Sequence, residues 1–261
     1  MKKMQKVLCM VTALLMGSGN VLAATWEKPV PNDCSLVNGE KFYLYNASVD
    51  GFATTGDIQV WLAEEGVAIQ FRQEPNGDWT LESESGYWYS DLDYVGCNGG
   101  AGEDNSRWCI EQQASGTYHL RPSKNDPTFS WELYPDAWMG VSYSTWGVAS
   151  LVKAEEGSID WSLVSEADYA YFVSKLNLHR TMTELQGYGY DVTELLAVYH
   201  TATDKAAFDA AVSGVQDVLD GLRIDHATEE HPCDVTSIYV RNADLTENWV
   251  NDGHQRHDVS K

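Results

Sequence analysis

The stretch Phe42-Tyr43-Leu44-Tyr45 is the first of three similar aromatic stretches, and its repetition decides the fold. The other two are Tyr87-Trp88-Tyr89-Ser90 and Trp131-Glu132-Leu133-Tyr134, so the pattern recurs about every 40 to 44 residues. Each copy ends on an aromatic residue, a polar residue and a leucine, at Trp79-Thr80-Leu81, Tyr118-His119-Leu120 and Trp161-Ser162-Leu163. Short stretches rich in Tyr, Trp, Val and Thr, separated by turn signals, are typical of strands. The repeats therefore predict four short strands per copy, in a mainly β domain over residues 38–165.

Beyond the repeats, the apolar residues change from strand spacing to helix spacing. Residues 166–186 have one apolar face and are expected to form a helix. Asp191 followed by Glu194 matches a capping box at the start of a second helix. Thr203 is the expected cap of a third helix, whose apolar residues form one stripe. Residues 166–225 are thus expected to form a small three-helix bundle that leans on the strand domain, because so small a core is marginal alone.

The two ends of the chain have patterns of their own. Residues 1–23 have a basic start, an apolar stretch and the small-residue site Val21-Leu22-Ala23, which together are typical of a cleaved export signal. The alternative is an amphipathic anchor that stays attached. Residues 24–37 form an N-terminal segment, and residues 226–261 hold one expected strand and a polar tail. We expect an exported protein, located in the periplasm, on the cell surface or outside the cell.

The chain is strongly acidic. It has 39 Asp and Glu against 17 Lys and Arg, which gives a net charge of -22. Cleavage after residue 23 removes three lysines and lowers this to about -25. Such a surface repels phosphate backbones and anionic lipids, so neither nucleic-acid binding nor membrane insertion is expected.

Four cysteines remain after the expected leader. Cys97 and Cys109 flank a turn of the middle repeat, where antiparallel strands could bring them within bonding distance. An even number of cysteines in an exported chain favours disulfides, so we expect this pair to be bonded. Cys34 with Cys233 then follows by elimination. Free buried thiols are the alternative.

The threefold pattern resembles a β-trefoil, in which three repeats of four strands close a short barrel capped by hairpins. Its aromatic and leucine positions look more like the fascin-like and exported bacterial trefoils than the ricin-type lectins, so no sugar-binding residue is carried over. The order of leader, trefoil, helical spacer and the strand Pro232-Cys233-Asp234-Val235-Thr236-Ser237 is similar to exported multidomain proteins of Bacteroidetes. There such a strand often begins a jelly-roll, carbohydrate-binding-like domain. The resemblance implies a truncated start of that domain here, or a tail that has been reused.

Tryptophans supply the candidate ligand site. Those at matching strand positions are expected in the core, at Trp79, Trp88, Trp131 and Trp161. Trp61 and Trp146 instead lie in expected loops, where an exposed indole offers a flat face to a sugar ring and one N–H donor. Asp57 and Ser144 are near them in sequence and could bond to hydroxyls. The alternative is that the two indoles cover the barrel rim as a structural lid.

The sequence lacks the common catalytic motifs. It has no Gly-x-Ser-x-Gly, no His-Glu-x-x-His and no phosphate-binding glycine loop, so we expect no enzyme, cofactor or metal site. The first hypothesis is an exported, non-catalytic module that binds a glycan. A protein-binding module, such as a protease inhibitor of the trefoil type, is the alternative. A structural spacer of a larger surface assembly is the third.

Overall fold

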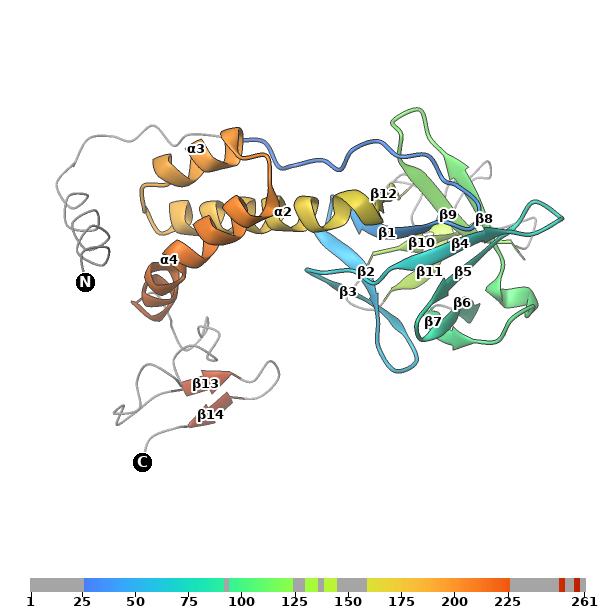
Figure 1. Ribbon diagram of the computed structural model, residues 1–261. Coiled ribbons are helices and arrows are strands. Elements are labelled where there is room, and N and C mark those ends of the chain that lie inside the picture. The colour runs from blue at the N-terminus through green and yellow to red at the C-terminus, as the bar shows by residue number, and fades with distance from the viewer. Residues whose placement is uncertain are drawn as a thin grey trace.

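The computed structural model describes residues 26–91, 94–123, 130–135, 139–144, 159–225, 249–251 and 256–258. Strands form one part of the molecule and helices the other (Figure 1). The strands of the first part are β1 (Lys41–Asn46), β2 (Gly51–Thr55), β3 (Val60–Ala63), β4 (Ile69–Gln73), β5 (Trp79–Ser83), β6 (Gly86–Asp91), β7 (Tyr94–Gly99), β8 (Trp108–Gln112), β9 (Tyr118–Pro122), β10 (Ser130–Tyr134), β11 (Gly140–Ser144) and β12 (Ser162–Ser165), with a 3-10 turn η1 (Asp104–Ser106).

Six of these strands follow one another around a ring of antiparallel pairs. β1 pairs with β4, β4 with β5, β5 with β8, and β8 with β9. On its other side β1 pairs with β12. A bridge between Tyr118 of β9 and Trp161, just before β12, joins the two ends of the series. The backbone groups of these two residues bond in both directions, at 2.7 and 3.0 Å.

The other six strands form three hairpins, β2–β3, β6–β7 and β10–β11, and each repeat contributes one. The hairpins also bond to one another. The Cys97 N–H donates to the Ile58 carbonyl, and the Val95 N–H to the Met139 carbonyl, both at 3.0 Å. The Met139 N–H donates in turn to the Val60 carbonyl at 3.0 Å. The three repeats therefore meet through their hairpins as well as through the ring.

Three large indoles fill the interior of the strand part. Trp88, Trp108 and Trp161 have no exposed surface. Each indole N–H has an acceptor, as a buried indole requires: the Ser83 hydroxyl for Trp88, the Trp88 carbonyl for Trp108 and the Leu133 carbonyl for Trp161, at 3.1 to 3.3 Å. The core positions predicted for Trp88 and Trp161 are confirmed, whereas Trp79 is only half-buried at the edge of the same core.

The described residues after β12 form three helices, α2 (Glu166–Gly187), α3 (Thr193–Thr201) and α4 (Lys205–Asp225). A mainly β part followed by three helices is thus confirmed. Ser165 caps α2, because its hydroxyl accepts the Asp168 N–H at 3.2 Å. The helices share an apolar core to which each contributes, with Leu178, Met182, Leu185, Val192, Leu195, Tyr199, Phe208 and Leu219 as its buried residues.

The predicted caps of the second and third helices are wrong in detail. Asp191 does accept the Thr193 N–H, at 2.9 Å, but Val192 occupies the cap position, so no capping box with Glu194 forms. At α4, Asp204 rather than Thr203 accepts the Ala207 N–H, at 3.0 Å. A carboxylate is as good an N-cap as a hydroxyl, and the chain offers both side by side.

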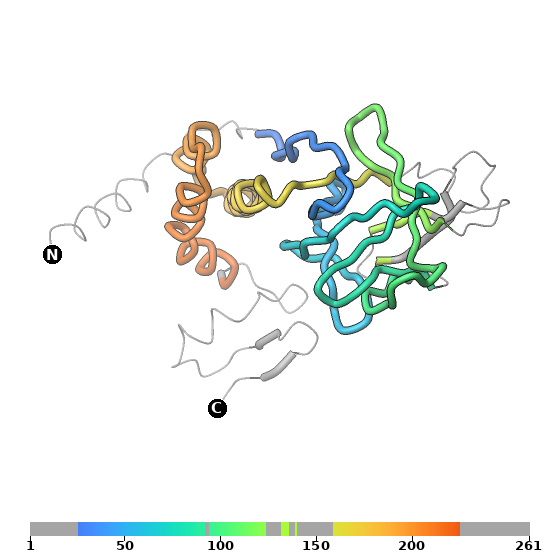
Figure 2. The backbone as a smooth tube through the Cα atoms, turned by 45° about the vertical axis from the view of Figure 1, so that its right-hand side comes forward, coloured from blue at the N-terminus to red at the C-terminus, as the bar shows by residue number. Residues whose placement is uncertain are grey.

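Helix α2 is packed on the strand part through a second aromatic cluster. Phe172, Val173 and Leu176 of α2 lie against the buried Tyr45, Phe52 and Val164. The N-terminal segment, blue in Figure 2, connects the two parts as well. The Tyr199 hydroxyl donates to the Glu27 carbonyl at 2.8 Å, and the Leu36 N–H donates to the Tyr118 hydroxyl at 3.1 Å.

The predicted disulfide between Cys97 and Cys109 is wrong, since both are free thiols. Cys97 points into the interior, where its sulfur lies 3.4 Å from the Gly56 carbonyl, while the Cys109 sulfur faces Asp78 at 3.8 Å. The side chains therefore leave their strands toward different neighbours. Cys34 is also a free thiol, and its sulfur lies 3.1 Å from the Leu163 carbonyl. Its expected partner Cys233 lies outside the described residues.

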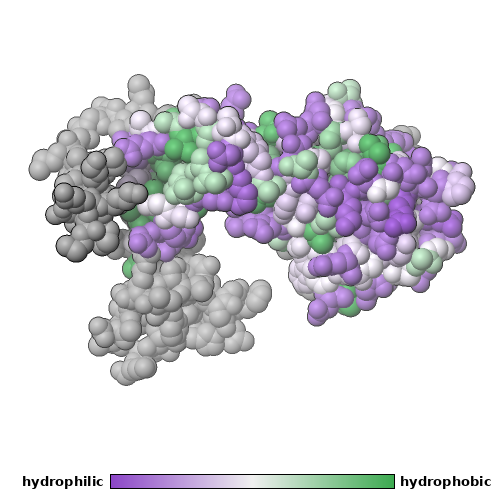
Figure 3. Space-filling model, in the orientation of Figure 1, coloured by the Kyte–Doolittle hydropathy of each residue, from purple (hydrophilic) through white to green (hydrophobic). Residues whose placement is uncertain are grey.

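Several other expectations also fall outside the described residues. They are the export signal of residues 1–23, Trp146 and the strand expected at residues 233–240. In the tail, β13 (Trp249–Asn251) pairs with β14 (Arg256–Asp258). No helix in the described part is long and apolar enough to cross a membrane. The strand part shows a mostly hydrophilic face in Figure 3, in keeping with the net charge of -22.

Candidate functional site

The residues predicted to bind a ligand do not all lie where the sequence placed them. Trp61 lies in strand β3, opposite Thr54 of β2, and not in a loop. Its half-buried indole rests on Gly56, where an added side-chain carbon would come within 2.4 Å of the indole nitrogen. The expectation of a free loop indole is therefore wrong for Trp61. Asp57 is exposed in the turn between β2 and β3.

The two ligand-site residues predicted in the third repeat, Ser144 and Trp146, stay predictions. Ser144 ends strand β11 opposite Ser130, and its side chain is not among those described. Trp146 lies outside the described residues. One further sequence signal was missed in the first repeat: Gln59-Val60-Trp61 has the Gln-x-Trp form of the ricin-type lectins. Because Val60 of this tripeptide is buried in the core, the motif here helps to hold hairpin β2–β3.

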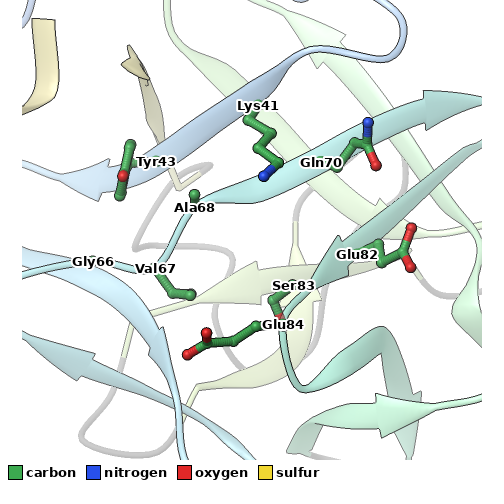
Figure 4. Close-up of a pocket in the computed structure, with 9 residues that line it drawn as sticks. All are labelled: Lys41, Tyr43, Gly66, Val67, Ala68, Gln70, Glu82, Ser83 and Glu84. Carbon is green, nitrogen blue, oxygen red and sulfur yellow. The ribbon is translucent and has the colours of Figure 1, made fainter. Parts of the chain in front are cut away.

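A hollow of about 430 Å³ lies where β1, β4 and β5 meet the loop that precedes β4, and none of the predicted site residues that the structure describes lines it (Figure 4). Its lining combines charged, amide, hydroxyl and backbone groups with two small apolar side chains and one aromatic ring. The lining residues are Lys41, Tyr43, Gly66, Val67, Ala68, Gln70, Glu82, Ser83 and Glu84.

Some polar side chains that line the hollow already form hydrogen bonds or ion pairs, and others do not. Glu82 lies 3.6 Å from the Arg72 guanidinium, which also donates to the Gln70 amide oxygen at 2.6 Å. Arg72 therefore holds two lining side chains in place. Among the described residues, neither Lys41 nor Glu84 forms a hydrogen bond or an ion pair through its side chain. An ammonium and a carboxylate thus remain available at the hollow.

The side of the hollow formed by Tyr43 and Gly66 is built with the help of helix α2. The Tyr43 ring stacks on the Tyr169 ring of α2, with centroids 3.5 Å apart and planes 7° from parallel. The Tyr169 hydroxyl accepts the Gly66 N–H at 2.7 Å and donates to the Gly66 carbonyl at 3.2 Å. Burial raises the pKa of Tyr169 to about 12 and also raises that of Tyr43, so both phenols are neutral at physiological pH.

Gly66 fits this site because it has no side chain. A carbon added to it would lie 3.0 Å from Cβ of Phe52 and 3.3 Å from the Ala53 carbonyl. Phe52 is completely buried between the strands and α2, so it has no room to move away. Any larger residue at position 66 would displace the loop that lines the hollow.

A second cluster of polar residues, around His119, lies on the other side of the ring of strands. Its Nε2 lies 2.9 Å from Asp160 Oδ1, and its Nδ1 lies 4.0 Å from the buried Glu132. Glu132 accepts the Ile159 N–H at 2.8 Å, and Thr117 donates to Asp160 at 2.8 Å. These bonds hold the segment before β12 against β9 and β10, beside the bridge that joins the ring. We interpret this group as structural.

The lining of the hollow presents polar groups of the kind that bind small polar ligands. Over the part of the chain that the structure describes, no group of three or more His, Cys, Asp or Glu residues could hold a metal ion. What the lining offers is a set of donors and acceptors at fixed positions beside a small apolar wall. That combination suits a ligand that carries several hydroxyl groups.

Comparisons with known proteins give only distant likenesses. No family model matches the chain, and no curated protein matches it. Among solved structures, it is similar to a mosquitocidal holotoxin at 14% identity and a TM-score of 0.38, over 51% of this chain and 18% of the toxin. A lysenin pore is similar at 10% identity and a TM-score of 0.36, over 50% of each chain. A β-1,3-galactosidase is similar at 12% identity and a TM-score of 0.38, over 50% of this chain and 28% of that enzyme. The chain thus spans half or less of each of these proteins, and likenesses of this size say nothing about its activity.

Proposed function

We propose that this protein is an exported, non-catalytic module that binds a carbohydrate through the hollow beside β1, β4 and β5. The observation that carries the proposal is the lining itself. Lys41 offers a hydrogen-bond donor and Glu84 offers acceptors, and neither side chain is bonded to another described residue. Arg72 contacts the side chains of Gln70 and Glu82 beside them. Sugars are bound mainly by such paired donors and acceptors on their hydroxyl groups, with apolar contact to one ring face.

The fold that we propose for the strand part is a β-trefoil. Its support is the ring β1–β4–β5–β8–β9–β12 together with three mutually bonded hairpins, one from each sequence repeat. In a trefoil, the six ring strands make the barrel and the three hairpins close one end. Export rests on the leader pattern of residues 1–23.

The charge of the protein narrows the class of glycan. A surface with a net charge of -22 repels polyanions, and the hollow itself contains two carboxylates. We therefore propose neutral or amine-bearing glycans as ligands, rather than sulfated or uronic-acid polymers. Binding to neutral glycans should depend little on salt, whereas binding to amine-bearing glycans should weaken as salt screens their attraction to the acidic surface.

The test is a glycan array followed by affinity electrophoresis with the chain from Ala24 to Lys261. We expect binding to neutral or amine-bearing glycans, and we expect Lys41→Ala with Glu84→Ala to weaken it by about tenfold or more. The matched control is Lys205→Ala with Glu194→Ala, which removes one charge of each sign from the helices. The proposal is overturned if no glycan is bound, or if the double variant at the hollow binds as well as the control.

A further inference from the structure

We propose that Tyr169 of helix α2 is a positioning residue of the glycan site, so that the hollow holds its ligand only with the helix in place. This inference rests on the proposed function. Tyr169 is not itself a lining residue, yet it contacts two that are, Tyr43 and Gly66. Both lie on the same side of the hollow in Figure 4.

The first contact fixes the loop before β4. Gly66, Val67 and Ala68 are three consecutive lining residues between β3 and β4. The Tyr169 hydroxyl takes both the N–H and the carbonyl of Gly66, and the Val67 N–H donates to the Ala53 carbonyl at 3.3 Å. One hydroxyl therefore satisfies both backbone groups of Gly66, the first of these three lining residues. If the Tyr169 hydroxyl is removed, Gly66 loses its hydrogen bonds to helix α2.

The second contact fixes the aromatic wall. The Tyr43 and Tyr169 rings are parallel to within 7° and lie 3.5 Å apart, so Tyr169 covers one face of the Tyr43 ring. A stacked ring has few other orientations open to it, and a ligand that meets Tyr43 does not have to order it. The same residue thus orients a loop and a ring that come from different parts of the strand unit.

The helix itself is anchored by other residues. Phe172, Val173 and Leu176 are buried against the strands, and Arg180 bonds to Asp50. Removal of the Tyr169 hydroxyl alone should therefore leave α2 docked and the fold intact. This separates the positioning role from a general role in stability.

The experiment compares Tyr169→Phe with the control Tyr171→Phe. Both substitutions remove one hydroxyl from the same helix, but the Tyr171 ring packs on Phe208 among the helices, away from the hollow. Two quantities are measured: amide hydrogen exchange over residues 66–68, without ligand, and the Kd for the glycan found on the array. In Tyr169→Phe we expect exchange at Gly66 to become faster and the Kd to rise about three- to tenfold. In Tyr171→Phe neither quantity should change.

The outcomes separate this inference from the proposed function. Unchanged exchange at Gly66 in Tyr169→Phe overturns the positioning role, as does faster exchange with an unchanged Kd. If the unmodified protein binds no glycan, the proposed function fails, and the inference fails with it. Equal effects of Tyr169→Phe and Tyr171→Phe would also overturn the inference, because they would indicate a general loosening of the helices.

Discussion

Arg180 of helix α2 forms a two-point contact with Asp50, the residue of the turn between β1 and β2 that has a positive φ of 54°. Its Nε lies 2.9 Å from the Asp50 carboxylate, and its Nη2 donates to the Asp50 carbonyl at 2.6 Å. The Tyr45 hydroxyl and the Lys28 ammonium reach the same carboxylate, at 2.7 and 3.2 Å. The turn, the helix and the N-terminal segment therefore meet at one carboxylate.

Stability is expected to depend on this contact and on pH. Burial opposes the ionisation of Asp50, but hydrogen bonds from Arg180, Tyr45 and Lys28 outweigh it and lower the pKa of its carboxyl group. A lowered pKa adds stability above the ordinary carboxyl pKa of about 4, and this stability is lost as the pH falls through the folded-state value. Arg180→Met should reduce the free energy of unfolding at pH 7 by about 1–3 kcal/mol.

Urea denaturation at pH 7 and pH 3 checks this prediction. The loss caused by Arg180→Met should be smaller at pH 3, where Asp50 is closer to neutral. The control is Lys205→Met, which breaks an exposed pair with Asp209 on α4 and should cost little. An Arg180→Met loss that is the same at both pH values would show that packing, and not the ion pair, holds α2 at this turn.

The thiols are expected to react slowly in the folded protein. Burial raises the pKa of Cys97 and of Cys109, and burial with the nearby Asp168 and Asp33 raises that of Cys34 to about 11. Since the thiolate is the reactive form, iodoacetamide at pH 7.5 should label the three thiols much more slowly before unfolding than after it. Peptide mass spectrometry of unreduced protein, alkylated for the same time with and without denaturant, measures this. A bonded Cys97–Cys109 peptide would contradict the structure.

Trp161 is expected to be among the most costly side chains to truncate. It is fully buried, and its indole N–H donates to the Leu133 carbonyl. Its backbone also bridges Tyr118 of β9, directly before the start of β12. Trp161→Ala should lower the free energy of unfolding by about 3–5 kcal/mol. Trp61→Ala should cost clearly less, because that indole is only half-buried over Gly56. Equal losses in chemical denaturation would argue against a core centred on Trp161.

The repeats predicted the strands and much of the core because both depend on local patterns. Trp88 lies in an aromatic, strand-like stretch and Trp161 lies between two polar residues, and both patterns are visible in sequence. The Tyr169–Gly66 contact joins residues 103 apart, so no local pattern reveals it. The disulfide failed for a related reason: the direction in which Cys97 leaves its strand depends on register, which a sequence does not specify.

The last prediction compares Gly66, in the loop before β4, with Gly214, in helix α4, because the two glycines have opposite surroundings. A side-chain carbon at Gly66 would press on the buried Phe52, whereas one at Gly214 of α4 would meet no atom within 4 Å. Gly214→Ala should therefore stabilise the protein by about 0.5–1 kcal/mol, because alanine favours the helix. Gly66→Ala should destabilise it by about 1 kcal/mol or more and should weaken glycan binding, since the loop must move. Thermal unfolding and the Kd measure both effects. If Gly66→Ala proved as stable as Gly214→Ala and kept the same Kd, the loop would have to be far looser than its contacts with Phe52 and Tyr169 indicate.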